Sequence, residues 1–179
     1  GIESNERRIV FTVANEEKTK KLIQAQKRHM HIGVPGHGIV IAVPIKSVGG
    51  GKTVAFLNGE TDNAAYTPSL NYSHELIVAV CSQGCTDMVM NAARAAGARG
   101  GTVLHGKGTG AKGAPKFYNI TIAQEKEMIM IVAAASQKAA IMQSILKKAG
   151  PDSKAGTIVF SLPTTHVAGF ALLDNQDEF

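Results

Sequence analysis

The chain has 179 residues, of which 44% are hydrophobic, 18% charged and 5% aromatic. This composition is globular and excludes collagen-like, disulfide-rich and disordered classes. The net charge of +5 divides into +3 over residues 1–72 and +2 over residues 73–179, so neither half resembles a basic nucleic-acid-binding arm. No apolar run approaches the roughly 18 residues of a membrane span, and the start has no signal-peptide core. We therefore expect a cytoplasmic protein that does not insert into membranes.

Three segments have the apolar spacing of helices. They run from the N-cap Asn15 to Arg28, from Thr86 to Gly97, and from the cap Ser136 to the stop at Gly150-Pro151. The first opens with acids and closes with bases, which suits the helix dipole. Glycine or proline follows the second and third, as expected where helices end.

Strand-like runs separate the helices. They cover Arg8–Val13, Ile39–Val43, Glu75–Cys81, Thr102–His105, Met128–Ala133 and Thr157–Leu162. From Glu75 onward the order is strand, helix, strand, glycine-rich loop, strand, helix, strand. This order predicts an α+β, ferredoxin-like βαββαβ sandwich. Lys116–Ile122 also alternates and is a candidate ribbon arm.

An internal repeat links the two ends of the chain. A strand, a helix and a second strand are followed in both copies by Pro-x-x-x-Val-x-Gly, at Pro44 and at Pro163. We therefore expect residues 1–57 to form a partial ferredoxin-like repeat without a visible first half. A linker at 58–73, a complete domain at 74–170 and a polar tail at 171–179 would follow.

The densest chemical signal is the segment Gly106–Gly113, which contains a literal G-x-G-x-x-G. A dinucleotide site needs a helix to open at its last glycine, but Ala114-Pro115 and a strand-like run follow, so that interpretation is rejected. Glycines can still turn successive N–H groups toward one anion. Lys107 and Lys112 add positive charge for a phosphate or carboxylate. The alternative is a surface loop with glycines for flexibility alone.

Other motifs favour structural roles over chemical ones. Gly49–Thr53 ends like a phosphate-binding loop but lacks its first glycine. Cys81 and Cys85 do not have C-x-x-C spacing and are expected to be buried small hydrophobes rather than metal ligands. The histidines His29, His31 and His37 are interpreted as solvated, with metal binding as the alternative. No nucleophile–base pair has support, so we do not expect an enzyme.

Residues 74–170 resemble the PII-type nitrogen-regulatory signalling proteins, in a form with a short effector loop. The likeness is carried by Ala95–Gly110, which reads AAGARGGTVLHGKGTG, and by Gly156–Pro163, which reads GTIVFSLP. The resemblance implies a ferredoxin-like trimer with ligand clefts between subunits. It implies ATP or ADP as ligand, with Mg and 2-oxoglutarate as further candidates. It also implies a loop, here at residues 108–125, that docks onto a transporter, enzyme or regulator.

The same resemblance supplies the expected ligand-binding residues. They are Thr102, Lys107, Gly108, Thr109, Gly110, Lys112, Gly156 and Thr157. This sequence departs from the family pattern because the arginines after the last strand are absent, and Thr157 replaces a basic residue. Fewer cations would then face a triphosphate. A smaller anion or a mononucleotide is a ligand that needs less positive charge.

Three function classes follow from these observations. The first is a ligand-sensing regulator, with no catalytic activity, that controls a partner protein in nitrogen metabolism. The second is a structural or interaction module that assembles through its sheet edges without a ligand. The third is a nucleic-acid binder, which the pI near 9.3 suggests but the lack of a basic helix face opposes.

Overall fold

The computed structural model describes residues 8–34, 36–45, 70–108, 116–117, 120–121 and 124–169. The chain divides into two compact units. The ferredoxin-like unit is Ser69–His166, and the N-terminal unit combines Gly1–Pro68 with Val167–Phe179. No helix in the described ranges has the length and apolar character needed to cross a membrane.

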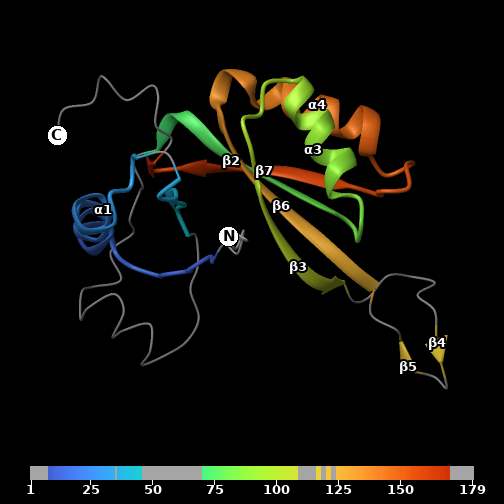
Figure 1. Cartoon of the computed structure of the whole chain (residues 1–179), viewed down its shortest axis with the longest axis horizontal. Coiled ribbons are helices and arrows are strands. Elements are labelled where there is room, and N and C mark those ends of the chain that lie inside the picture. The colour runs from blue at the N-terminus through green and yellow to red at the C-terminus, as the bar shows by residue number, and fades with distance from the viewer. Residues whose placement is uncertain are drawn as a thin grey trace, which may run out of the picture. The chain divides into compact units, whose positions relative to one another are not determined.

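The ferredoxin-like unit is built on a four-stranded antiparallel sheet (Figure 1). Its elements are β2 (Asn71–Ser82), α3 (Thr86–Ala95), β3 (Thr102–Gly108), β6 (Gln124–Ala134), α4 (Ala135–Ala149) and β7 (Ile158–Thr164). The strands lie side by side in the order β3-β6-β2-β7. Each helix connects two strands that are not neighbours in the sheet, which is the split βαβ arrangement. The predicted ferredoxin-like α+β fold is confirmed.

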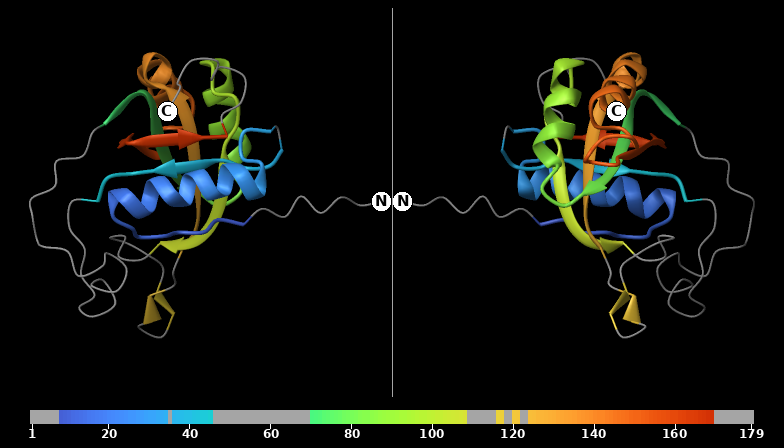
Figure 2. Two further views of the ribbon diagram at one scale, coloured as in Figure 1. Left: turned by 90° about the vertical axis from the view of Figure 1, so that its left-hand side faces the viewer. Right: turned by 90° about the vertical axis from the view of Figure 1, so that its right-hand side faces the viewer.

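Both helices of this unit cover the same face of the sheet (Figure 2). Side chains alternate between the two faces of a strand, so every second residue points at the helices. In β6 these are Ile129, Ile131 and Ala133, and they pack with Ile141 and Ile145 of α4 in one buried cluster. This cluster is the core that holds the sheet edges in place.

The structure corrects how one helix begins and confirms how another ends. Ser136 is not a cap, because α4 starts at Ala135 directly after β6 and has no side-chain cap. Packing against the sheet therefore sets this boundary. The predicted stop after α3 is confirmed. Gly97 adopts a φ of +102°, and its N–H donates to the Arg94 carbonyl at 3.0 Å, as in a glycine-terminated helix.

A two-stranded ribbon is present where Lys116–Ile122 alternates. Its strands are β4 (Lys116–Phe117) and β5 (Ile120–Thr121), which pair antiparallel. The predicted ribbon arm is therefore confirmed for these four residues.

The N-terminal unit contains α1 (Glu16–Met30), β1 (Val40–Ala42) and all but the first residue of β8 (His166–Ala168). The two short strands pair with each other. Ile23, Ile32 and Ala168 form its small buried cluster. The predicted N-cap is confirmed, since Asn15 accepts a hydrogen bond from the Lys18 N–H at 2.9 Å.

The first predicted strand of this unit is wrong. Residues Arg8–Val13 adopt no strand, and the side chains of Val10 and Phe11 are exposed. The strand pairings of the described residues do not include this run. An apolar run becomes a strand only when a partner strand exists.

Candidate functional site

The beginning of the glycine-rich segment is strand rather than loop. Gly106, Lys107 and Gly108 are the last residues of β3, and they pair with Lys126, Glu125 and Gln124 of β6. Neither glycine has a positive φ, so neither uses the left-handed backbone that glycine adopts more readily than other residues. A side chain at Gly108 would instead meet Lys126, with a Cβ–Cγ distance of 3.0 Å. Thr109, Gly110 and Lys112 lie outside the described residues.

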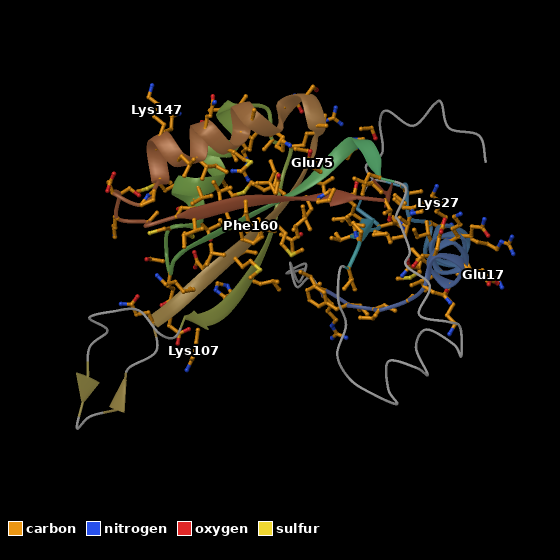
Figure 3. The ribbon with its side chains drawn as sticks, turned by 180° about the vertical axis from the view of Figure 1, so that it is seen from behind. Glu17, Lys27, Glu75, Lys107, Lys147 and Phe160 are labelled. Atoms are coloured by element: carbon orange, nitrogen blue, oxygen red, sulfur yellow. The ribbon has the colours of Figure 1, made fainter. Side chains whose placement is uncertain are left out.

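Lys107 contributes a positive charge at the end of β3 (Figure 3). Its side chain is 70% exposed, and its Nζ lies 3.6 Å from Oε1 of Glu125 on the neighbouring strand. Exposed ion pairs of this kind contribute little to stability. Lys107 can therefore leave Glu125 and pair with an anion with little loss of folding free energy.

Gly156 and Thr157 precede β7 and differ in exposure. Gly156 has a φ of +54° with open space where a side chain would stand. Thr157 is fully buried, and its N–H donates to the Ala149 carbonyl at 3.1 Å. Its hydroxyl oxygen has no hydrogen-bond partner, which is uncommon for a buried polar atom. Gly156 is thus the accessible residue of the two.

The expected ligand residues fall on opposite edges of one sheet. Thr102, Lys107 and Gly108 belong to β3, and Gly156 and Thr157 precede β7. Two strands separate β3 from β7, which at the usual strand spacing is roughly 14 Å. A single copy of this unit does not bring the two groups together.

Glu127 is a buried carboxylate that the sequence interpretation missed. It is 5% exposed, and it accepts hydrogen bonds from the N–H of Gly84 at 3.0 Å and from the N–H of Thr86 at 3.1 Å. The Thr86 hydroxyl donates a third at 2.6 Å. These N–H groups belong to the turn before α3 and to its first turn, where helices have unpaired donors. Glu127 therefore caps α3 from β6.

The hydrogen bonds to Glu127 also set its charge state. They lower the pKa of its carboxyl, with the Thr86 hydroxyl as the largest cause and the Gly84 N–H next. The Nδ1 atom of His105 lies 3.8 Å away but its side chain is 72% exposed. The sequence pattern could have identified Glu127 as buried, because it continues the inward alternation of Ile129 and Ile131 along the strand.

The turn that Glu127 holds also contacts the Gly156 segment. The N–H of Ser82, at the end of β2, donates to the Ala155 carbonyl at 2.9 Å. The N–H of Cys85 donates back to the Ser82 carbonyl at 3.2 Å. One continuous set of backbone hydrogen bonds thus joins the start of α3 to the residue before Gly156.

The cysteine side chains are packed in the core of the ferredoxin-like unit. Cys81 and Cys85 are free and buried in the core, and burial is the main cause that raises the pKa of the Cys81 thiol to about 11. Such a thiol is unreactive at neutral pH. Within the described part of the chain, no three His, Cys, Asp or Glu side chains are placed to hold a metal ion together.

Comparison with known proteins gives a family. The model of "Nitrogen regulatory protein P-II" matches residues 74–169, just over half of the chain, and no curated protein matches. A solved structure, Arabidopsis thaliana PII bound to citrate, is similar at 22% identity with a TM-score of 0.38. The similar region covers 52% of this chain and 76% of the Arabidopsis chain. On the family match, the chain belongs to the nitrogen regulatory protein P-II family.

Proposed function

We propose that this protein is a sensor that binds a small anionic metabolite or an adenine nucleotide and controls a partner protein of nitrogen metabolism. The observation that carries the proposal is the placement of the expected ligand residues on two opposite sheet edges. The β3 edge of one copy and the Gly156 segment of another form one site only when copies assemble. The family resemblance implies such an assembly, with clefts between subunits.

Exposed apolar side chains on the sheet face opposite the helices support assembly. On this face Leu76, Val78 and Val132 are buried. Opposite the helices the sheet presents apolar side chains, and three of them, Met128, Ile158 and Phe160, are exposed. Phe160 lies on the side of β7 away from α4 (Figure 3). Exposed apolar patches on a sheet favour association with another surface. A homo-oligomer of this chain is the occupant that we propose.

Ligand binding would act on the connection between β3 and β6, which the sequence predicts as a loop at residues 108–125. Gly108 at its start and Gln124 and Glu125 at its end belong to the strands. An anion that pairs with Lys107 releases Glu125, the first charged residue of β6. The ligand would then bias the loop toward the conformation that its partner recognises. The size of the response is set by the difference in ligand affinity between the two conformations.

The ligand is tested by isothermal titration of ATP, ADP and AMP, with and without Mg and 2-oxoglutarate. The informative variants are Lys107→Ala on one edge and Gly156→Asp on the other. Asp tolerates left-handed backbone but repels an anion, and Gly156→Asn is its neutral control. Lys147→Ala, an exposed lysine of α4 (Figure 3), is the control for loss of charge.

A mixing experiment tests whether the site forms between copies. Lys107→Ala and Gly156→Asp chains, each without binding, are unfolded together and refolded. If sites span two copies, mixed oligomers contain some interfaces with both edges intact, and part of the binding returns. Absence of any binding by an intact wild-type oligomer would refute the sensor and favour the structural module. Binding of nucleic acid that weakens steeply with salt would favour the third class.

A further inference from the structure

We propose that the N-terminal unit is one half of a second ferredoxin-like sandwich, and that the same half of another copy of this chain completes it. The internal repeat indicates which half is present. The strand-like run Ile9–Val13, α1 and β1, with the motif at Pro44, follow the same order as β6, α4 and β7, with the motif at Pro163. This interface is separate from the proposed anion site and does not depend on it.

Matching positions of the two repeats differ in exposure. The middle residue of the first run is Phe11, which is 77% exposed, whereas the middle residue of the matching run in β6 is Ile131, which is fully buried. Leu22 of α1 is 37% exposed, and Ile141 of α4, at the same distance before the proline of its repeat, is fully buried. The cluster that buries Ile131 and Ile141 includes residues of β2 and α3. The exposed positions of the N-terminal unit are therefore those that a strand–helix–strand half covers in the ferredoxin-like unit.

The symmetry of the ferredoxin-like unit explains why an identical half can supply this cover. The unit consists of two strand–helix–strand halves, β2-α3-β3 and β6-α4-β7, and their first strands pair antiparallel at the centre of the sheet. When the two halves are exchanged and the sheet is read from its other edge, the order is again β3-β6-β2-β7. The halves are thus related by an approximate two-fold axis. A two-fold axis also relates the chains of a symmetric dimer, so two copies of one half can form the same sheet.

The strand pairing of the dimer follows from this symmetry. The run Ile9–Val13 pairs antiparallel with the same run of the second copy, as β6 pairs with β2. β1 pairs with that run of the second copy too, as β7 pairs with β2. β1 already pairs with β8, but a strand has two edges for hydrogen bonding, so β8 does not prevent this contact.

The composition of the run suits pairing with itself. Of the five residues of Ile9–Val13, four are β-branched and one is aromatic, which are the residue types that favour strands. The run contains no proline and no charged residue. Antiparallel pairing of two identical runs therefore places no like charges opposite each other.

The test is the mass of the full chain in solution, measured by analytical ultracentrifugation. Phe11→Asp places a charge in the proposed interface and should lower the particle mass about twofold. Because the Phe11 side chain is exposed within one copy, the variant should keep its circular dichroism spectrum. The matched control is Leu146→Asp, which changes an exposed apolar residue of α4 and should leave the mass unchanged.

Hydrogen exchange locates the contact within the chain. The amides of Ile9–Val13 should exchange about tenfold or more slowly in the wild-type chain than in Phe11→Asp, because strand pairing protects them. Phe160→Asp separates this interface from assembly through the sheet face of the ferredoxin-like unit. It should leave at least a dimer, in which Ile9–Val13 is still protected.

Three results would overturn this interface. The first is a monomeric wild-type chain. The second is a particle mass that Phe11→Asp leaves unchanged while circular dichroism shows that the variant is folded. The third is slow exchange of Ile9–Val13 in both wild type and Phe11→Asp, which would place the cover within one chain. None of these outcomes depends on a ligand: a mass halved by Phe11→Asp without any anion binding would refute the sensor and leave this interface in place.

Discussion

Helices α1 and α4 have the same length, 15 residues each, but different sources of stability. The α1 helix has a side-chain cap, and its salt bridges Lys20–Glu16 and Lys21–Glu17 measure 2.7 and 2.6 Å, yet it buries only Ile23. The α4 helix has no side-chain cap but buries three residues. Local interactions thus specify α1, and tertiary packing specifies α4.

This difference matters for function because the proposed anion site depends on packing. The strands that carry its residues keep their register through the core beneath α3 and α4. Helix α1 instead depends on its own cap and ion pairs. Mutations that separate packing from local interactions should therefore separate the two units.

The largest expected effect is on the core under α4. Ile145→Ala should destabilise the ferredoxin-like unit by about 3 kcal/mol, because it opens a cavity in a close-packed cluster. The matched change Ile23→Ala should cost about 1 kcal/mol, since its cluster is small and borders solvent. Urea unfolding with hydrogen-exchange readout of each unit measures both. Equal losses would contradict the contrast between the helices.

Glu127→Gln should lower the free energy of unfolding by about 2 kcal/mol, because it weakens three hydrogen bonds to a buried carboxylate. The surface control Glu125→Gln should cost well under 1 kcal/mol. Both are measured by urea unfolding at neutral pH.

The ionised carboxylate of Glu127 should also make the stability of the fold depend on pH in the acid range. The pKa of Glu127 is lowered in the folded chain from its ordinary value of 4.5. Its stabilisation is therefore complete above pH 4.5 and is lost as the pH falls through the lowered folded value. Glu127→Gln should flatten this part of the stability–pH curve. A curve that keeps its wild-type slope would show that other acids dominate it.

A pair of buried threonines distinguishes a satisfied hydroxyl from an unsatisfied one. Thr164 donates its hydroxyl proton to the His74 carbonyl at 2.9 Å, whereas the Thr157 hydroxyl has no partner. Thr164→Val should therefore lower the free energy of unfolding by about 1 kcal/mol. Thr157→Val should raise it by a similar amount. Thermal unfolding decides the sign. If Thr157→Val is more stable but binds the anion less well, its hydroxyl serves the ligand.

An effect on stability of similar size is expected at the cap of α1. Asn15→Ala removes the acceptor for the Lys18 N–H and should cost about 1 kcal/mol. Hydrogen exchange in the first turn of α1 should accelerate, with α4 unchanged. The reciprocal variant Ala134→Ser adds a side-chain cap to α4 and should change its exchange little. A large gain would show that α4, too, depends on local interactions.

The sequence by itself determined the order of helices and strands in the ferredoxin-like unit, the fold of that unit and the cap of α1. Each follows from local spacing, as with Asn15 before an acidic first turn. Only the tertiary structure decided that Gly108 is strand, that Ser136 is no cap and that Arg8–Val13 lacks a strand partner. These depend on partners far along the chain. Glu127 is the clearest case, because its hydrogen-bond donor Gly84 lies 43 residues away, and only folding brings them together.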